Sequence, residues 1–338
     1  MTTTVAVLGA TGAVGREILN ILAEREFPAG TVHALASGRS QGKRVSFGED
    51  AELTVQNVQD FDFSGVDLVL SSPGGAVAAE YAPKAARAGA VVVDNTSTFR
   101  MEPDVPLVVP EVNPSALAGY SKRGIVANPN CSTIQMVMAL KPLHNLFGLS
   151  RLVVATYQAT SGSGKAAMDE LFTQTRGIYM NESAQPHEFP KQIAFNAIPH
   201  IGDFLSDGST KEEDKMVRET RKILSPDVRV APTCVRIAAF IGHGEAIHAE
   251  FETEVDERQA ADALRDFPGV SLVDYREPGG YVTPYECAGE DPVFVSRLRR
   301  DPSVDNGLAF WCVSDNLRKG AALNTVQIAE TLLRDYLK

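Results

Sequence analysis

The sequence predicts an α/β protein with two domains: an N-terminal Rossmann-type doubly wound parallel sheet and a C-terminal α+β domain. In the first half, short and almost wholly apolar runs alternate with helical, alanine-rich stretches, as in a parallel sheet covered on both faces. In the second half, longer runs alternate apolar with polar residues, which is typical of a mixed or antiparallel sheet with one covered face. A glycine-rich turn between the first strand and the first helix supports the doubly wound prediction.

The elements of the first half follow from these patterns. Apolar runs predict five strands, at 3–9, 31–37, 66–72, 90–94 and 107–110. Apolar side chains at helical spacing predict two helices, at 9–24 and 76–89. Strands and helices therefore alternate, as a doubly wound sheet requires.

The second half has its own set of strands and helices. Strand-like runs occupy 228–242, 245–255, 293–300 and 308–314. Helical patterns occupy 163–177 and 209–224. The final segment, 321–337, is strongly amphipathic, and one of its faces carries Ala322, Val326, Ala329, Leu333 and Tyr336. We expect this last helix to pack against the first domain.

Composition excludes several classes of protein. The 338 residues are 44% apolar and 22% charged, which suits a globular protein with a sizeable core. The formal net charge of -11 disfavours nucleic acids and anionic membranes as partners, because phosphate-rich surfaces select basic faces. The longest uncharged run, 124–140, contains Asn, Pro, Ser and Thr and does not predict a membrane span. Since no signal-peptide pattern is visible, we expect a cytoplasmic protein.

The four cysteines are Cys131, Cys234, Cys287 and Cys312, and they show neither CxxC pairing nor the histidine spacing of a zinc site. We therefore expect reduced thiols and no metal. Cys131 differs from the others because polar residues flank it on both sides, in "NPNCST" at the expected start of a helix. A helix N-terminus stabilises a thiolate, so Cys131 is the candidate nucleophile.

The glycine-rich turn predicts a nucleotide site. Its residues are Gly9, Thr11, Gly12, Ala13, Val14 and Gly15, in which the glycines form G-x-x-G-x-x-G. Glycines let backbone N–H groups approach a pyrophosphate, and the positive end of the helix dipole adds to the attraction. A tight turn without a ligand is the alternative interpretation.

The end of the second predicted strand favours NADP over NAD. An NAD site usually places an acid roughly 20 residues beyond the glycines, on the ribose hydroxyl. Here no Asp or Glu occurs between Glu26 and Glu49, and Arg39 and Ser40 follow the strand instead. Their side chains suit a 2′-phosphate, which would repel a carboxylate. A solvated basic loop is the alternative.

His243 is the best candidate for a base, because it lies between Gly242 and Gly244 at the end of an apolar run. The glycines leave room for a substrate, and the ordinary pKa of an imidazole lies near neutrality. Arg236 lies seven residues earlier on the same run. Because an odd offset places two residues on opposite faces of a regular strand, a bend at Gly242 is needed to bring them together.

Six segments together resemble the aspartate-β-semialdehyde dehydrogenase family: "GATGAVG", "NPNCST", "YQATSGSGK", "EEDKMVRETRKIL", "VRIAAFIGHGEA" and "VSDNLRKGAALNTVQIAE". The resemblance covers nearly the whole chain in the right order. The combination of "NPNCST" with "GHGEA" is quite specific, although many members have serine where Gly244 follows the histidine. The implied fold is an NADP-binding Rossmann domain at 1–130, completed by a helix at 318–338. A catalytic and dimerisation domain of the glyceraldehyde-3-phosphate-dehydrogenase-like type is implied at 131–317.

The resemblance implies a reversible reaction in which NADPH and aspartyl phosphate give aspartate semialdehyde, NADP and phosphate. This step supplies the biosynthesis of lysine (by way of diaminopimelate), threonine and methionine. A thiolate displaces phosphate from the acyl phosphate, and the resulting thioester accepts hydride. Members of the family form homodimers through the second domain, and some form tetramers.

The resemblance also implies roles for particular residues. Cys131 is the nucleophile, His243 the acid–base group, and Gln158 orients the thioester carbonyl. The implied substrate contacts are Arg236 for the carboxylate, Glu212 for the ammonium, and Lys215 and Arg100 for the phosphate. The implied nicotinamide contacts are Ser161, Gly162 and Asn316. Without the resemblance, Glu212 and Lys215 would be interpreted as an exposed pair on one helix face, and Arg100 as a loop arginine.

Two alternatives stay open. A reductase of a related acyl phosphate, such as N-acetylglutamyl phosphate, would have a blocked amine and would not need an acid at Glu212. A non-catalytic NADP-binding redox sensor would use Cys131 as its switch and would need a resolving cysteine nearby. No other cysteine is close to Cys131 in sequence, although Cys234 or Cys312 could be close in space.

Overall fold

The computed structural model describes residues 3–182 and 185–337. Contacts divide the chain into two compact units, one of 1–130 with 321–338 and one of 131–320. Residues 1, 2 and 338 of the predicted first domain, and 183 and 184 of the second, lie outside the described residues. The predicted boundaries at 130/131 and 317/318 stay a prediction for the folding domains of the chain.

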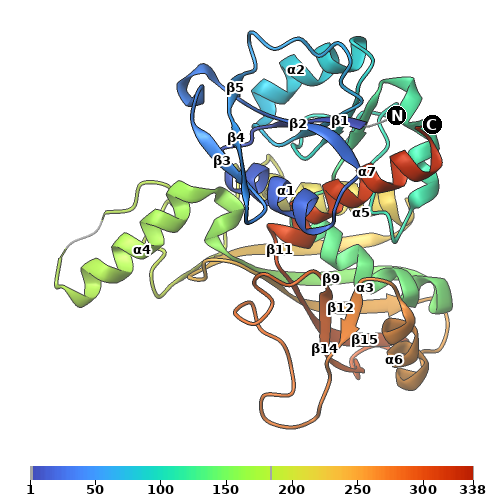
Figure 1. Cartoon of the computed structure of the whole chain (residues 1–338). Helices are drawn as coiled ribbons and strands as arrows, with labels where there is room; N and C mark the ends of the chain where they lie inside the picture. The colour runs from blue at the N-terminus through green and yellow to red at the C-terminus, as the bar shows by residue number, and fades with distance from the viewer. Residues whose placement is uncertain (1–2, 183–184, 338) are drawn as a thin grey trace. The chain divides into compact units, whose positions relative to one another are not determined.

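The first unit contains a six-stranded parallel sheet in the order β5-β2-β1-β6-β7-β8 (Figure 1). Its strands are β1 (Thr3–Leu8), β2 (Ala29–Ala36), β5 (Gln56–Asn57), β6 (Leu68–Ser71), β7 (Val91–Asp94) and β8 (Ile125–Ala127). The chain runs outward from β1 to β2 and β5 and then crosses to β6 on the other side. Ligands of such sheets bind at this reversal, beyond the carboxyl ends of the strands.

The predicted strand at 107–110 is wrong. Leu107 makes only an isolated bridge with Ala127, and the edge strand of the sheet is β8. Pro106 and Pro110 bracket this apolar run, and proline lacks the N–H group that a strand ladder requires. The run is nevertheless buried, which explains why its composition resembles that of a strand.

Helices α1 (Ala13–Glu24), α2 (Gly75–Arg87) and α7 (Leu323–Asp335) belong to the first unit. Helix α7 packs against α1, as Figure 1 shows, and contacts β6 and β7. Ile18 and Leu22 of α1 share one core with Val326 and Leu332 of α7. The C-terminal segment therefore completes the first unit. A short hairpin of β3 (Arg44–Phe47) and β4 (Ala51–Thr54), and the 3-10 helices η1 (Gly38–Ser40) and η2 (Pro114–Lys122), fill the connections.

The second unit contains a seven-stranded mixed sheet in the order β10-β11-β9-β12-β15-β14-β13 (Figure 1). Its strands are β9 (Leu149–Gln158), β10 (Ala197–Ile198), β11 (Arg229–Ile237), β12 (His243–Phe251), β13 (Val270–Leu272), β14 (Val293–Arg300) and β15 (Gly307–Ser314). The helices α3 (Cys131–Phe147), α5 (Lys211–Ile223) and α6 (Glu257–Asp266) contact the sheet, and α3 also contacts both α5 and α6. Along β12, buried positions alternate with more exposed ones from Glu245 to Phe251, so one face is covered, as the alternation predicted.

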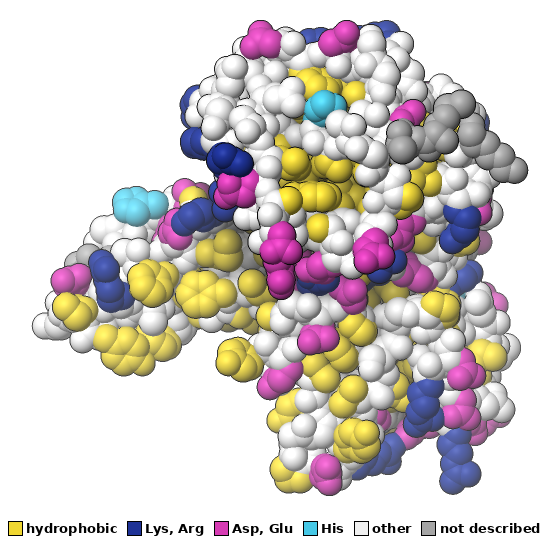
Figure 2. All heavy atoms as spheres, in the orientation of Figure 1, with side chains coloured by type: hydrophobic (Ala, Val, Ile, Leu, Met, Phe, Trp, Pro, Cys, Tyr) yellow, Lys and Arg dark blue, Asp and Glu magenta, His cyan; other side chains and the backbone are white. Residues whose placement is uncertain are grey.

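Helix α4 (Lys165–Tyr179) projects from the second unit and carries exposed aromatic side chains (Figures 1 and 2). Phe172, Tyr179 and Phe195 are 58%, 79% and 64% exposed. The rings of Tyr179 and Phe195 meet edge to face, with their centroids 5.9 Å apart. Exposed apolar patches of this kind mark interaction surfaces.

Candidate functional site

The sheet of the second unit aligns four buried polar side chains in one row. Gln158 on β9 pairs with Arg236 on β11 and with His243 on β12, and His243 pairs with Ser314 on β15. Residues opposite one another in a ladder point to the same face. The row therefore brings together three residues predicted from the sequence, and we call Arg236, Gln158, His243 and Ser314 the upper row.

Arg236 and His243 do not lie on one strand, contrary to the sequence interpretation. They belong to β11 and β12, and the loop between these strands turns at Gly242, which has φ +91°. Because β9 lies between the two strands, the odd sequence offset places no restriction on their faces. Register across three strands brings the guanidinium and the imidazole to the same side.

His243 is fully buried, and its electrostatics differ from the sequence expectation. Burial and then the positive charge of Arg236 lower its pKa to about 3, so the imidazole is neutral at physiological pH. Its Nδ1 accepts a hydrogen bond from the N–H of Ala159 at 3.1 Å. Its Nε2 makes no hydrogen bond with the described residues. The expected near-neutral pKa is therefore wrong for the unliganded protein.

Gly162 keeps open the space between the imidazole and the guanidinium. A Cβ atom at this position would lie 3.0 Å from Nη1 of Arg236 and 3.1 Å from Nε2 of His243. Arg236 is 4% exposed and donates from Nη1 to the carbonyl oxygen of Ala159 at 2.6 Å. A side chain at residue 162 would fill a space that a small substrate needs.

Helix α5 brings two charged candidates to the same row. Its start is fixed by a capping box between Thr210 and Glu213. Lys215 Nζ lies 2.9 Å from Oε2 of Glu212, and Nε2 of Gln158 donates to Oε1 of Glu212 at 3.1 Å. Gln158, Glu212 and Lys215 thus form one chain of contacts, and the shared helix face predicted for the charged pair is confirmed.

Cys131 is the first residue of α3 and is partly exposed, whereas the other three cysteines are buried. A Cβ atom at Gly320 would lie 2.9 Å from Cβ of Cys131, so this glycine makes room for the cysteine. Burial raises the pKa of Cys287 to about 12, and it also raises the pKa values of Cys234 and Cys312. Of the four thiols, Cys131 has the setting of a nucleophile.

Ser161 and Asn316 form a two-way contact. The hydroxyl and the side-chain amide exchange hydrogen bonds of 3.1 and 2.9 Å, and Oδ1 of Asn316 also accepts from the N–H of Gly242 at 2.9 Å. Asn316 therefore ties the Gly242 turn to the loop that carries Ser161 and Gly162. Its implied contact with nicotinamide stays a prediction.

In the first unit, the glycine-rich turn fits a pyrophosphate. Gly9 has φ +88°, and a Cβ atom there would lie 2.6 Å from the carbonyl oxygen of Ser72. A Cβ atom at Gly15 would collide with the carbonyl group of Gly9. Gly12 caps α1 without a side-chain hydrogen bond, so no capping side chain covers the helix N-terminus. Thr11, Ala13 and Val14 are partly exposed between these glycines.

The other first-unit candidates lie at the carboxyl ends of β2 and β7. Arg39 is exposed and Ser40 is half-buried in η1, which follows β2. Arg100 is 7% exposed and donates from Nε to the carbonyl oxygen of Asn128 at 2.9 Å and from Nη2 to that of Asn95 at 3.0 Å. Arg100 lies in the loop after β7, where backbone carbonyls hold its buried guanidinium in place, and its contact with phosphate stays a prediction.

Comparison with known proteins decides the family. Models described as "Semialdehyde dehydrogenase, NAD binding domain" and "Semialdehyde dehydrogenase, dimerisation domain" match residues 4–120 and 140–319. Aspartate-semialdehyde dehydrogenase of Legionella pneumophila is 53% identical over 98% of this chain and 96% of its own length. Aspartate-semialdehyde dehydrogenase 2 of Vibrio cholerae is 50% identical over 98% of both chains. The chain belongs to the aspartate-semialdehyde dehydrogenase family.

Solved structures of aspartate-semialdehyde dehydrogenases have the same fold as this chain. The Vibrio cholerae aspartate semialdehyde dehydrogenase II complexed with ASA matches with a TM-score of 0.97, at 49% identity over 99% of both chains. The Candida albicans enzyme with NADP matches with a TM-score of 0.78, at 26% identity over the whole of both chains. The predicted family and fold class are confirmed: a Rossmann-like nicotinamide-binding domain with a dimerisation domain, in an oxidoreductase.

Sequence reasoning missed several buried polar residues that lie behind the candidate site of this protein. Gln135, Thr156 and Glu245 are all fully buried. Gln135 lies four residues after Cys131 on a helix, and Glu245 lies two residues after His243 on a strand. Both offsets repeat the face of a candidate catalytic residue, and this was the available signal.

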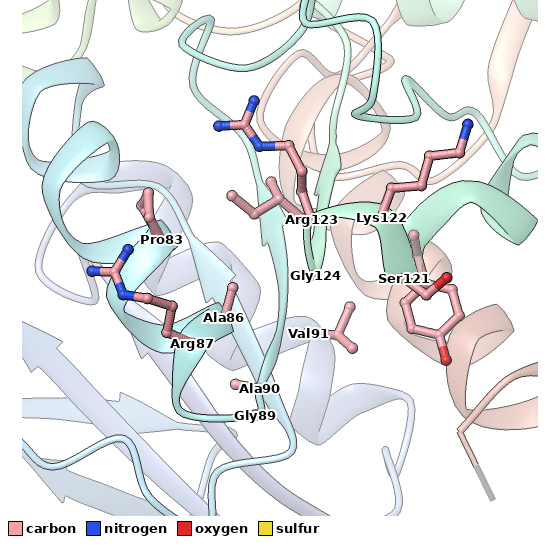
Figure 3. A pocket seen from close by; sticks show the side chains of 12 residues that line it. Pro83, Ala86, Arg87, Gly89, Ala90, Val91, Ser121, Lys122, Arg123 and Gly124 are labelled. Carbon is pink, nitrogen blue, oxygen red and sulfur yellow. The ribbon is translucent and has the colours of Figure 1, made fainter.

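The first unit also contains a pocket of about 470 Å³, which none of the candidate site residues lines (Figure 3). Val91 and Ile125, which begin β7 and β8, line it together with Arg87, Lys122 and Arg123. In a parallel sheet this is the edge opposite the glycine-rich turn. Arg87 and Lys122 lie in the last turns of α2 and η2, where cations complement the negative ends of helices.

No helix within the described residues is both long and apolar enough to span a bilayer.

Proposed function

We propose that the protein catalyses the NADP-dependent reductive dephosphorylation of L-aspartyl-4-phosphate to L-aspartate-4-semialdehyde, and the reverse reaction. The observation that carries the proposal is the upper row with α3 and α5. An imidazole, a carboxamide, a guanidinium, a carboxylate and an ammonium surround the sheet face below a helix that begins with a cysteine. This set matches a substrate that carries a carboxylate, an ammonium and an acyl phosphate.

The chain's own residues account for each step. The thiolate of Cys131 attacks the acyl carbon, the C–O bond to phosphate breaks, and phosphate leaves with the electron pair. The hydride for the thioester carbon would come from NADPH when it is bound. The amide N–H of Gln158 stabilises the oxyanion, whose collapse breaks the C–S bond and returns the thiolate. Because Nδ1 of the neutral His243 accepts from the N–H of Ala159, the ring proton lies on Nε2, from which His243 can act as a general acid by donating a hydrogen bond to the developing oxyanion.

The charged residues hold the ends of the substrate. The buried Arg236 guanidinium suits the α-carboxylate, and Glu212 suits the ammonium. Lys215 and Arg100 supply positive charge for the phosphate. An acid at Glu212 supports a free-amine substrate, because an N-acetylated one carries no ammonium for this 6% exposed carboxylate to bind.

The site also bears on the redox-sensor alternative. A sensor needs a resolving thiol, but burial holds the pKa values of Cys234, Cys287 and Cys312 above the ordinary value. These thiols are poor partners for Cys131. For the assembly we propose a homodimer formed through the second unit. A tetramer would form by association of two such dimers. The cytoplasmic location expected from the sequence stays a prediction.

The test is a spectrophotometric assay with aspartate semialdehyde, phosphate and NADP. We expect NADPH formation that requires phosphate. A matched reaction with N-acetylglutamate semialdehyde should give little or no NADPH. Faster turnover of the acetylated aldehyde would establish the related acyl-phosphate reductase instead, and no turnover of either would refute the proposal.

A further inference from the structure

A second polar row lies directly behind the upper row. Cys234, Thr156, Glu245 and Cys312 occupy the adjacent same-face positions of β11, β9, β12 and β15. We call these four residues the lower row. All four are fully buried. Polar side chains at such positions require partners, and an acid requires them most.

Glu245 is the acid of the lower row. Neither carboxyl oxygen makes a hydrogen bond with the described residues. Burial raises its pKa well above 4.5. The titratable groups near it are uncharged at neutral pH, because burial lowers the pKa of His243 on its own strand and raises those of Cys312 on β15 and Cys234 on β11. With no cation among these groups, burial favours the neutral carboxylic acid at Glu245.

Gln135 of α3 connects the lower row to the nucleophile. It lies one turn after Cys131 and on the same face of the helix. Its Oε1 accepts from the Ser314 hydroxyl at 2.7 Å, and its carbonyl oxygen accepts from the Cys312 thiol at 3.6 Å. Its amide is the polar group that lowers the pKa of Glu245 against the effect of burial. The Nε2 hydrogens of Gln135 make no hydrogen bond of good geometry within the described part of the chain.

We propose that Glu245 is a positioning residue for Cys131, as an uncharged acid that faces the amide of Gln135 and seats the first turns of α3 on β12 and β15. This rests on the proposed function only in taking Cys131 as the nucleophile. An apolar side chain at residue 245 would remove the acceptor group that faces the Gln135 amide. An ionised one would be a buried charge without a counter-charge. A neutral group with a carbonyl oxygen meets both requirements.

The experiment compares Glu245→Leu, Glu245→Gln and the control Ile247→Ala. Ile247 is the next buried residue on the same face of β12 and lies farther from His243. The readouts are kcat, the KM values, and the pH dependence of Cys131 alkylation by iodoacetamide. We expect Glu245→Leu to lower kcat about tenfold or more with little change in KM, and to move the alkylation profile. Glu245→Gln should restore both, and Ile247→Ala should lower stability without moving the alkylation profile.

A second readout tests the protonation state. When folding raises the pKa of an acid, the native state binds a proton that the unfolded state has already lost at intermediate pH, so the free energy of unfolding falls as pH rises. The contribution of Glu245 is present below the unfolded value of 4.5 and is lost as pH rises toward the folded pKa. Wild type should therefore lose stability relative to Glu245→Gln as pH rises from 4.5.

Three outcomes would overturn the proposal. One is loss of turnover in Glu245→Gln as large as in Glu245→Leu, which would make the acid a proton-transfer group. Another is a wild-type alkylation profile in Glu245→Leu. The third is parallel stability curves for wild type and Glu245→Gln. If Glu245→Leu does not fold, Gln135→Leu carries the same expectation. Alkylation requires no substrate, so it reports on positioning even if the proposed function fails.

Discussion

At the scale of single residues, the helix N-terminus explains why the thiol lies at residue 131. The first-turn N–H groups of α3 favour a thiolate, and Asn-Pro-Asn keeps the preceding chain out of the helix. Cys131→Ser should fold normally and still bind NADP, yet lose nearly all turnover, because an alcohol is scarcely ionised at neutral pH. Mass spectrometry after mixing with substrate should show an acyl adduct on the peptide that contains Cys131. An adduct on Cys234, Cys287 or Cys312 would show that the mechanism is wrong.

His243 gives a prediction on pH. Because burial lowers its pKa to about 3, the imidazole is already unprotonated across the ordinary assay range. The acid limb of kcat/KM, which reports on the free enzyme, should therefore not show the ordinary histidine pKa of about 6.5. His243→Ala should lower turnover by about 10²–10⁴-fold without creating a new acid limb. A wild-type limb near 6.5 that disappears in His243→Ala would contradict the neutral, buried imidazole.

Arg39 gives the residue-scale prediction for the cofactor. Its side chain is exposed after β2, and no Asp or Glu occurs in the sequence between Glu26 and Glu49 to repel a 2′-phosphate. Arg39→Ala should raise the KM for NADP far more than the KM for NAD, by about tenfold if one charge-assisted contact is lost. Arg44→Ala, on the neighbouring hairpin, serves as a matched loss of one positive charge. Equal changes for both cofactors would remove the argument for NADP.

At the scale of elements, α5 couples two substrate groups. Lys215 rests on Glu212, so the substrate ammonium and Lys215 approach the same carboxylate. An arriving ammonium should favour release of Lys215 toward the phosphate. Lys215→Ala should raise the phosphate KM in the reverse assay by about tenfold or more, and Arg100→Ala should do the same. The control is Lys211→Ala, a substitution on the same helix that removes only an exposed ion pair with Asp203. If the phosphate KM is unchanged in both site variants, Lys215 and Arg100 do not bind phosphate and have a structural role.

Elements that depend on local spacing were predictable from the sequence. Glu212 and Lys215 share a helix face because they lie three residues apart, and α3 begins where the Asn-Pro-Asn stretch ends. The upper row was not predictable, because it depends on the register of β11, β9 and β12, and no local pattern encodes which residues lie opposite one another. For the same reason the seven-residue offset of Arg236 and His243 misled the interpretation. The neutral pKa expectation failed because burial is a property of the folded sheet.

At the scale of the whole molecule, two units divide the proposed work. The glycine-rich turn belongs to 1–130 with 321–338, and the candidate catalytic residues except Arg100 belong to 131–320. The chain leaves the first unit at Cys131 and returns to it after Gly320, whose missing side chain leaves room for Cys131. The nucleophile therefore lies at the junction of the two units in sequence.

The last prediction concerns the homodimer. Phe172, Tyr179 and Phe195 expose most of their side chains around α4, and an aromatic cluster of this kind on a monomer indicates a surface that a partner covers. Tyr179→Asp combined with Phe195→Asp should therefore shift the protein toward monomer, because a charge would be buried without a partner. Sedimentation velocity over a range of concentrations measures the shift, which should weaken self-association about tenfold or more. Leu146→Asp, at a 48% exposed position near the end of α3, is the matched control and should stay dimeric. A double variant that associates as tightly as wild type would place the dimer contact on another surface of the second unit.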